Sequence, residues 1–146
     1  MKQSGPRHIA REFALRELVG LHFLHDLDID PLPPVSNWWG KDDRLSVNRD
    51  AESFARQMIA GVRKQTDRLD AMIQQHAKNW RLERMTKVDR NLLRLSVWEL
   101  LFNPETPTRV ILNEALELAK CYGDQDSYRF VNGILDPLAK SVRKNQ

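Results

Sequence analysis

Two arginines near the start of the chain have the spacing needed to bind phosphate. Arg7 and Arg11 lie four residues apart, which places both guanidinium groups on one helix face, within reach of neighbouring phosphates. Lys2 precedes them and adds a further positive charge. A solvated helix face carries the same charges, so the spacing alone leaves both interpretations open.

Aromatic and acidic side chains near the other end of the chain could contact bases. The last helix has a predicted buried stripe made of Val131, Ile134, Leu135, Leu138 and Val142. Phe130 lies about 100° from Val131, at the margin of that stripe, where it could stack under an unpaired base or complete the core. Asp126 shares its face and could accept a hydrogen bond from a base amino group. Tyr122 is a second stacking candidate, and Arg129 could neutralise phosphate nearby.

Residues suited to catalysis or metal binding form no convincing set. His22 and His25 are three apart and precede Asp26, Asp28 and Asp30, so they could share a metal, but no second histidine or cysteine cluster supports such a site. The chain has no glycine-rich phosphate loop, no nucleophile motif and no Cys-x-x-Cys. We expect Cys121 to be a small core residue. The sequence therefore predicts a protein that is not an enzyme and has no cofactor or metal.

The composition is that of one soluble globular domain. The 146 residues are 41% hydrophobic and 29% charged, and none of the apolar runs approaches the ~20 residues of a membrane helix. Residues 1–7 lack the apolar centre of a signal peptide, and a single cysteine allows no internal disulfide, so a cytoplasmic location is expected. The net charge is only +3, so a polyanion partner has to be met by a local patch.

Apolar residues recur three to four apart, which predicts helices. This period covers residues 7–25, then runs continuously from about 48 through 73, and returns from 92 to 101, with a break expected within 79–87. Thr106 is expected to cap the next helix, and Gly123 is expected to end it. Asp124 or Asp126 is expected to cap the last helix, which runs to about residue 142. The prediction is a single all-α domain, residues 1–146, with six or seven helices.

An irregular insertion interrupts this pattern at about residues 26–48. It contains three of the seven prolines and the pair Trp38–Trp39. Adjacent tryptophans do not easily enter one core, so one is expected to seal the bundle and the other to be exposed. The insertion could shield a binding face, mediate self-association or pack down, and the sequence leaves these alternatives open.

The C-terminal half contains motifs more particular than helical periodicity requires. They are Asn113-Glu114, Ala119-Lys120, Tyr122-Gly123 and Phe130-Val131-Asn132-Gly133, preceded by Val88-Asp89-Arg90, Leu93-Arg94-Leu95 and Trp98-Glu99-Leu100. The chain thereby resembles the NusB family of bacterial transcription antitermination factors, strongly over residues 80–139 and weakly over 7–23, with no likeness evident between. We interpret Asn132-Gly133 and Asn113 as architectural: Gly133 for a close backbone approach and Asn113 as a buried, hydrogen-bonded side chain.

The resemblance implies a NusB-like helical fold and a function. NusB-like proteins bind a boxA element in ribosomal RNA leader transcripts together with NusE, a small-subunit ribosomal protein, and help RNA polymerase resist termination. Their arginine-rich segment corresponds to residues 7–11, where this chain has His8 and Ile9 in place of further basic residues. The resemblance implies RNA contacts from Lys2, Arg7, His8 and Arg11. Their RNA surface includes the positions of Phe130 and Asp126.

The resemblance also implies a protein-partner surface at Asp89, Arg90 and Arg94. From the residues alone these charges would form an ordinary solvated helix face. Trp98, on the same apolar helix, is expected to be buried.

Two other functions remain open at this level. Similar domains direct ribosomal RNA cytosine methyltransferases to RNA, but no catalytic domain accompanies this one. Alternatively, the chain is a protein-interaction module that has lost RNA binding and self-associates, and a homodimer could bury the RNA face. The few basic residues in the segment 7–11 and the pair Trp38–Trp39 favour this alternative.

Overall fold

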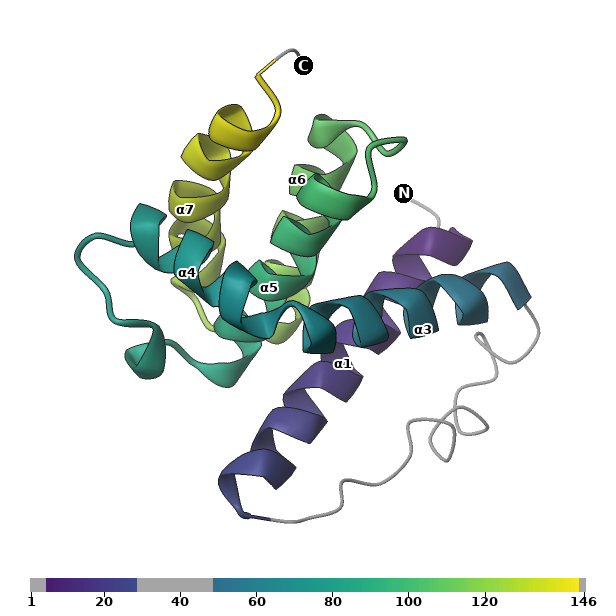
Figure 1. The fold of residues 1–146 in the computed structure, drawn as a ribbon, viewed down its shortest axis with the longest axis horizontal. Coiled ribbons are helices and arrows are strands. Elements are labelled where there is room, and N and C mark those ends of the chain that lie inside the picture. Colours follow the sequence, from purple (N-terminus) through teal and green to yellow (C-terminus); the bar gives the residue numbers. More distant parts are fainter. Residues whose placement is uncertain (1–4, 29–48, 145–146) are drawn as a thin grey trace. The chain divides into compact units, whose positions relative to one another are not determined.

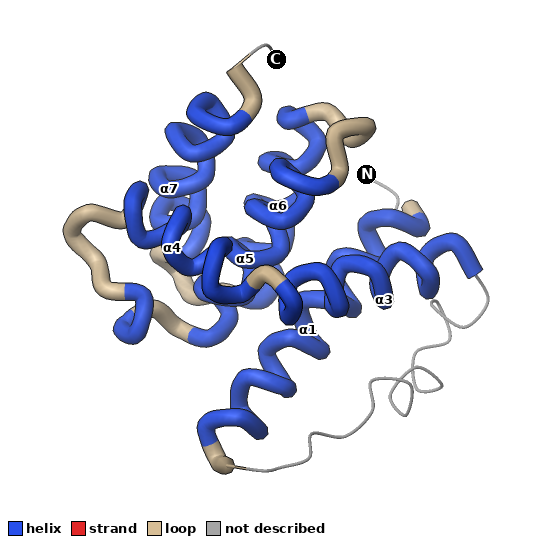
Figure 2. The backbone as a smooth tube through the Cα atoms, in the orientation of Figure 1, coloured by secondary structure: helices blue, strands red, loops and turns tan. Residues whose placement is uncertain are grey.

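The computed structural model describes residues 5–28 and 49–144, and its described elements are all helical (Figures 1 and 2). This part of the chain contains six α-helices and one short 3-10 helix, which confirms the predicted all-α fold. None of the described helices combines the length and apolarity that crossing a bilayer requires. Lys2, Trp38–Trp39 and most of the predicted insertion lie outside the described residues. The chain divides into two compact units, residues 1–60 and 61–146.

The first unit begins with α1 (Pro6–Asp26), the helix predicted over residues 7–25. Pro6 occupies its first turn, where the missing N–H costs nothing because no helical partner exists there. The predicted apolar positions are buried: Ala10, Phe13, Ala14, Leu18 and Leu21. The chain leaves the helix through Asp28, whose φ of 57° lies in the left-handed region that aspartate tolerates better than most residues.

Phe54, on α3 (Arg49–Lys64), ties the two helices of the first unit together. The guanidinium carbon of Arg7 lies 3.8 Å from the centre of its ring, and that of Arg11 lies 5.5 Å away. A cation over the face of an aromatic ring is attracted by the ring's quadrupole. The prediction that both arginines share one helix face is therefore confirmed.

The helical run predicted from 48 through 73 is in fact two helices. α3 ends at Lys64, and α4 (Thr66–His76) begins after Gln65. The hydroxyl of Thr66 donates to the carbonyl oxygens of Val62 at 2.8 Å and Arg63 at 3.2 Å. Such bonds from a side chain back to the preceding turn bend helices. Apolar spacing could not reveal this break because the buried stripe continues across it.

The second unit is organised around α5 (Lys87–Phe102), which contacts α4, α6 and α7 (Figure 1). All ten residues from 91 to 100 are buried, as expected for a central helix, and Trp98 is among them as predicted. The helix follows the break predicted within 79–87, which holds the 3-10 helix η3 (Leu82–Arg84). Thr86 caps α5 by accepting a hydrogen bond from the Asp89 amide at 3.1 Å.

The cap of α6 (Thr108–Tyr122) differs from the prediction. Pro107, not Thr106, is the cap residue. The Thr106 hydroxyl instead accepts a hydrogen bond from the side-chain amide of Asn103 at 2.9 Å. Gly123 ends the helix, as predicted.

The start of α7 (Ser127–Val142) uses both predicted aspartates, but neither as a conventional side-chain cap. Asp126 is the cap residue without a side-chain cap bond, whereas the Asp124 carboxylate accepts from the Asp126 amide at 2.9 Å.

Several exposures predicted from the sequence are wrong. Cys121 and Asn113, expected in the core, are exposed, and Glu114 takes the buried position instead. Gly133 is exposed with no atom close to the place of an added Cβ, so the expected backbone approach does not occur. Val142 is only half-buried. Periodicity identifies the centre of a buried stripe, but the neighbouring helices decide how far its margins are covered.

Alanine substitutions at two glycines of the second unit are expected to change the free energy of unfolding in opposite directions. A Cβ on Gly61 would lie against the indole ring of buried Trp98, closer than real side chains approach, whereas one on Gly133 meets open space. We expect Gly61→Ala to lower the free energy of unfolding by about 1–3 kcal/mol through overpacking. Gly133→Ala should raise it by about 0.5–1 kcal/mol. Urea denaturation of both variants checks this, and a neutral Gly61→Ala would contradict it.

The partly buried carboxyl group of Glu17 is expected to make the stability of the protein depend on pH. Burial raises its pKa from 4.5 to about 7, while neighbouring Arg16 opposes the shift. The folded state therefore holds this proton more tightly than the unfolded chain, and stability falls as the pH rises from 4.5 to about 7. We expect Glu17→Gln to raise the melting temperature above pH 7 and to change it little at pH 4.5. The exposed Glu83→Gln is the control and should show no such difference between the two pH values.

Candidate nucleic-acid interface

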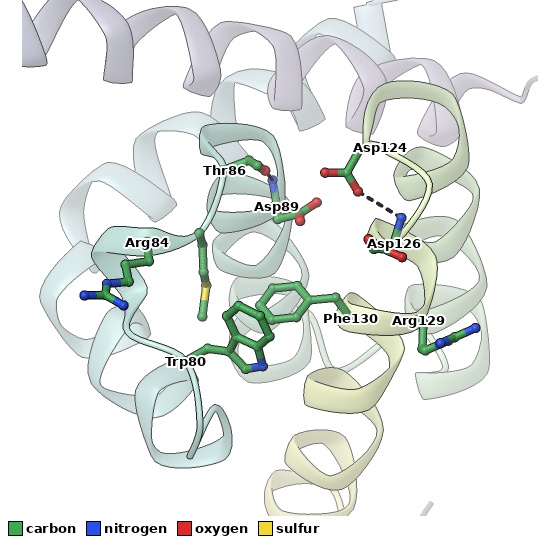
Figure 3. Close-up of a pocket in the computed structure, with 9 residues that line it drawn as sticks. Trp80, Arg84, Thr86, Asp89, Asp124, Asp126, Arg129 and Phe130 are labelled. Carbon is green, nitrogen blue, oxygen red and sulfur yellow. Dashed lines mark hydrogen bonds between the residues drawn. The ribbon is translucent and has the colours of Figure 1, made fainter.

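A pocket of about 490 Å³ lies in the second unit (Figure 3). Its walls come from the segment around η3, from the first turn of α5, and from the start of α7 with the loop before it. These segments meet because α4 and α7 both pack against α5.

Two aromatic rings form the apolar wall of the pocket. Trp80 and Phe130 meet edge to face, with ring centres 5.7 Å apart and ring planes at 81°. Trp80 is 57% exposed, although it is one of the largest apolar side chains in the protein. Gln74 anchors the segment that carries it: its amide donates to the Trp80 carbonyl at 2.7 Å and accepts from the Leu82 amide at 2.9 Å. The exposed indole is therefore held on an ordered segment.

Three carboxyl groups face the pocket on the side of the helix termini: Asp89, Asp124 and Asp126 (Figure 3). Asp89 is only 6% exposed. Burial raises its pKa above the ordinary value, the Asp124 carboxylate adds to the rise, and hydrogen bonds from Ser127 and Thr86 oppose it. The acidic side of the pocket therefore repels phosphate and favours hydrogen-bond donors.

Two exposed arginines, Arg84 and Arg129, complete the lining. Each offers a planar cationic group that binds phosphate oxygens. The pocket therefore combines stacking surfaces, phosphate-binding cations and acceptors for base donors, which together suit an unpaired nucleotide.

The structure brings together three of the predicted RNA-binding residues, Asp126, Arg129 and Phe130. Tyr122 is half-buried at the end of α6 and does not line the pocket.

The other described members of the predicted RNA set belong to the first unit. Arg7 is exposed and His8 is half-buried, whereas Arg11 is 3% exposed. Arg7 is thus the more accessible of the two arginines. Whether any of these residues binds RNA stays a prediction.

Trp80 and Arg84 are pocket residues that the sequence interpretation missed. A usable signal was present: Trp80 is a large aromatic residue in the charge-rich stretch 79–87, where no apolar period accounts for it. Asp89 was assigned to a partner surface, although it lines this pocket.

The three residues predicted to contact a protein partner are not an ordinary solvated face. Asp89 and Arg94 are buried, and Arg90 is half-buried. Arg94 forms a two-pronged ion pair with Asp70 of α4, with Nε–Oδ1 and Nη2–Oδ2 distances of 2.6 and 2.7 Å. Arg90 reaches the same carboxylate at 3.5 Å. These arginines hold α4 to α5, and partner contact through them stays a prediction.

The histidine pair does not form a metal site within the described residues. His22 Nε2 lies 3.9 Å from Asp26 Oδ2, and His25 Nδ1 lies 3.7 Å from Asp26 Oδ1. No group of three or more potential metal ligands placed to hold an ion occurs among the described residues. Asp30 lies outside the described residues.

Comparison with known proteins gives consistent results. A model described as the NusB family matches residues 8–140, including the middle of the chain, where the motifs gave no likeness. Over 140 residues the chain is 39% identical to the transcription antitermination protein NusB of Myxococcus xanthus, covering 96% of this chain and 99% of that protein.

Solved structures agree with this result. The chain matches NusB of T. maritima with a TM-score of 0.77 and 34% identity, covering 96% of this chain and 93% of that one. It also matches a crystal structure of the antitermination factors NusB and NusE in complex with double-stranded RNA, with a TM-score of 0.70 and 26% identity, covering 93% and 97% of the two chains.

Removal of the Arg94 side chain, and with it the Arg94–Asp70 ion pair, is expected to destabilise the protein strongly. Arg94→Ala would leave the Asp70 carboxylate without its closest cation in a largely buried setting, and we expect about 3 kcal/mol of destabilisation in urea denaturation. Arg56→Ala is the matched control, since Arg56 pairs with Glu52 at 3.0 Å on an exposed helix face and should cost about 0.5 kcal/mol or less. Equal effects of the two substitutions would show that the Arg94 pair does not hold the helices together.

Proposed function

Because this chain belongs to the NusB family, we propose that it is a transcription antitermination factor that binds RNA and catalyses no reaction. Its role is to bind a boxA-type single-stranded element in ribosomal RNA leader transcripts and help RNA polymerase resist termination. The observation that carries this proposal is the pocket lined by the paired rings of Trp80 and Phe130, two arginines and three carboxyl groups.

NusE is the proposed protein partner, since a related NusB was crystallised with NusE and RNA. Modest affinities for RNA and for NusE would combine through effective concentration when both are held in one complex. We further propose that both units act as one RNA-binding domain in the cytoplasm, where transcription takes place. Arg7 in the first unit and the pocket in the second would each contribute to RNA affinity.

Titration of a fluorescent boxA-like RNA, with and without NusE and at two salt concentrations, tests this function. We expect NusE to tighten binding and salt to weaken it. Arg7→Ala should reduce the slope of log affinity against log salt by about 0.7, the value for one phosphate contact on a single strand. Phe130→Ala should cost about 1–3 kcal/mol of binding free energy through lost stacking.

Two exposed residues outside these surfaces provide the controls. Arg109→Ala removes an exposed arginine of α6, and Tyr128→Ala removes an exposed aromatic residue of α7 that does not line the pocket. Both should bind RNA like the wild type. If the wild type binds no RNA even with NusE present, the proposal is wrong and a self-associating module becomes the better interpretation.

A further inference from the structure

The pocket beside Trp80 contains an acceptor that lacks a donor. Oδ1 of Asp89 is buried and has no hydrogen-bond partner among the described residues, although Ser127 and Thr86 interact with the same carboxyl group. A buried acceptor left unpaired destabilises the folded state, and more so when it is charged, so native structures rarely retain one without a reason. Asp89 lines the pocket, and its carboxyl group points toward the loop that carries Asp124 (Figure 3). A ligand that brings a donor to this position would remove the penalty.

The other walls restrict what that ligand can be. The perpendicular rings of Trp80 and Phe130 offer one flat face for stacking and one edge beside it, which suits a planar group. The exposed guanidinium groups of Arg84 and Arg129 point outward on opposite sides of the pocket, where each suits an anion beside it (Figure 3). A lysine or arginine side chain from a protein could satisfy Asp89, but it would offer no anion to Arg84 and Arg129. A planar donor joined to a phosphate fits all three walls, and this describes a nucleotide.

The unpaired oxygen also distinguishes between bases. Cytosine, adenine and guanine carry an exocyclic amino group that donates to a carboxylate. Uracil carries carbonyl oxygens on both sides of its single N–H, and these would meet the acidic side of the pocket formed by Asp89, Asp124 and Asp126. We propose that this pocket selects an unpaired base with an exocyclic amino group over uracil, and that Oδ1 of Asp89 accepts the hydrogen bond from that group. This selection rests on the proposed RNA-binding function.

Cytidine and uridine make the sharpest test, because the two bases have nearly the same shape and differ in the amino group. Binding of an oligouridine is compared with binding of the same strand carrying one central cytidine or adenosine, in the presence of NusE. The wild type should bind the amino-bearing strands at least about fivefold more tightly. Asp89→Asn keeps the size of the side chain but adds donors that suit uracil carbonyls, so the preference should vanish or reverse.

A second variant keeps the test valid if Asp89→Asn does not fold. Trp80→Ala removes a side chain that is 57% exposed, so folding should be retained, and it should weaken binding of every strand at least about fivefold. Tyr128→Ala, an exposed aromatic residue of α7 outside the pocket, should change neither affinity nor preference.

The outcomes separate this selection from RNA binding itself. Equal affinity of the wild type for all strands would overturn the base selection and leave the RNA-binding function standing. An unchanged affinity of Trp80→Ala would likewise exclude this pocket as the site of selection. If no strand binds the wild type, the base selection and the proposed function are both overturned.

Discussion

The burial of α5 from residue 91 to residue 100 is the constraint on which the second unit depends. Residues 91–100 are all buried, so each polar group among them needs a partner within the protein. Ser96 donates to the Leu92 carbonyl, and Arg94 is paired with Asp70. The end of the helix is satisfied from far along the chain: Arg143 donates to the carbonyl oxygens of Glu99, Leu100 and Asn103, at 2.8 to 3.1 Å. These bonds fix α4 and the end of α7 against the central helix.

The pocket follows from the same arrangement. Its acidic side combines the first turn of α5, where Thr86 caps the helix and Asp89 is buried, with Asp124 and Asp126 just before α7. Its aromatic wall combines Trp80, on the segment between α4 and α5, with Phe130 at the start of α7. Substitutions that weaken the packing of α4 or α7 against α5 are therefore expected to affect binding without touching RNA, which is why stability has to be measured beside affinity.

A protein that acts by holding RNA and a partner needs accessible contacts rather than reactive groups. Trp80 is exposed on a segment whose backbone Gln74 anchors, so little backbone freedom is lost when the indole engages a ligand. Arg7 is exposed but already rests on the Phe54 ring, which orients its guanidinium in the same way. Ordering of contact residues before binding is a common source of affinity in a small interface.

Periodicity and local motifs are properties of neighbouring residues, so the helical class, the central place of α5, the helix ends near proline and glycine, and the family could all be predicted from the sequence. Which charges are buried depends on how the helices pack and could not be predicted. Asp89 and Arg94 look solvated in sequence, whereas Cys121 and Asn113 look buried, and all four are the reverse because neighbouring helices determine what is covered. The meeting of Trp80 with Phe130 was equally hidden, since it arises from packing between segments distant in the chain.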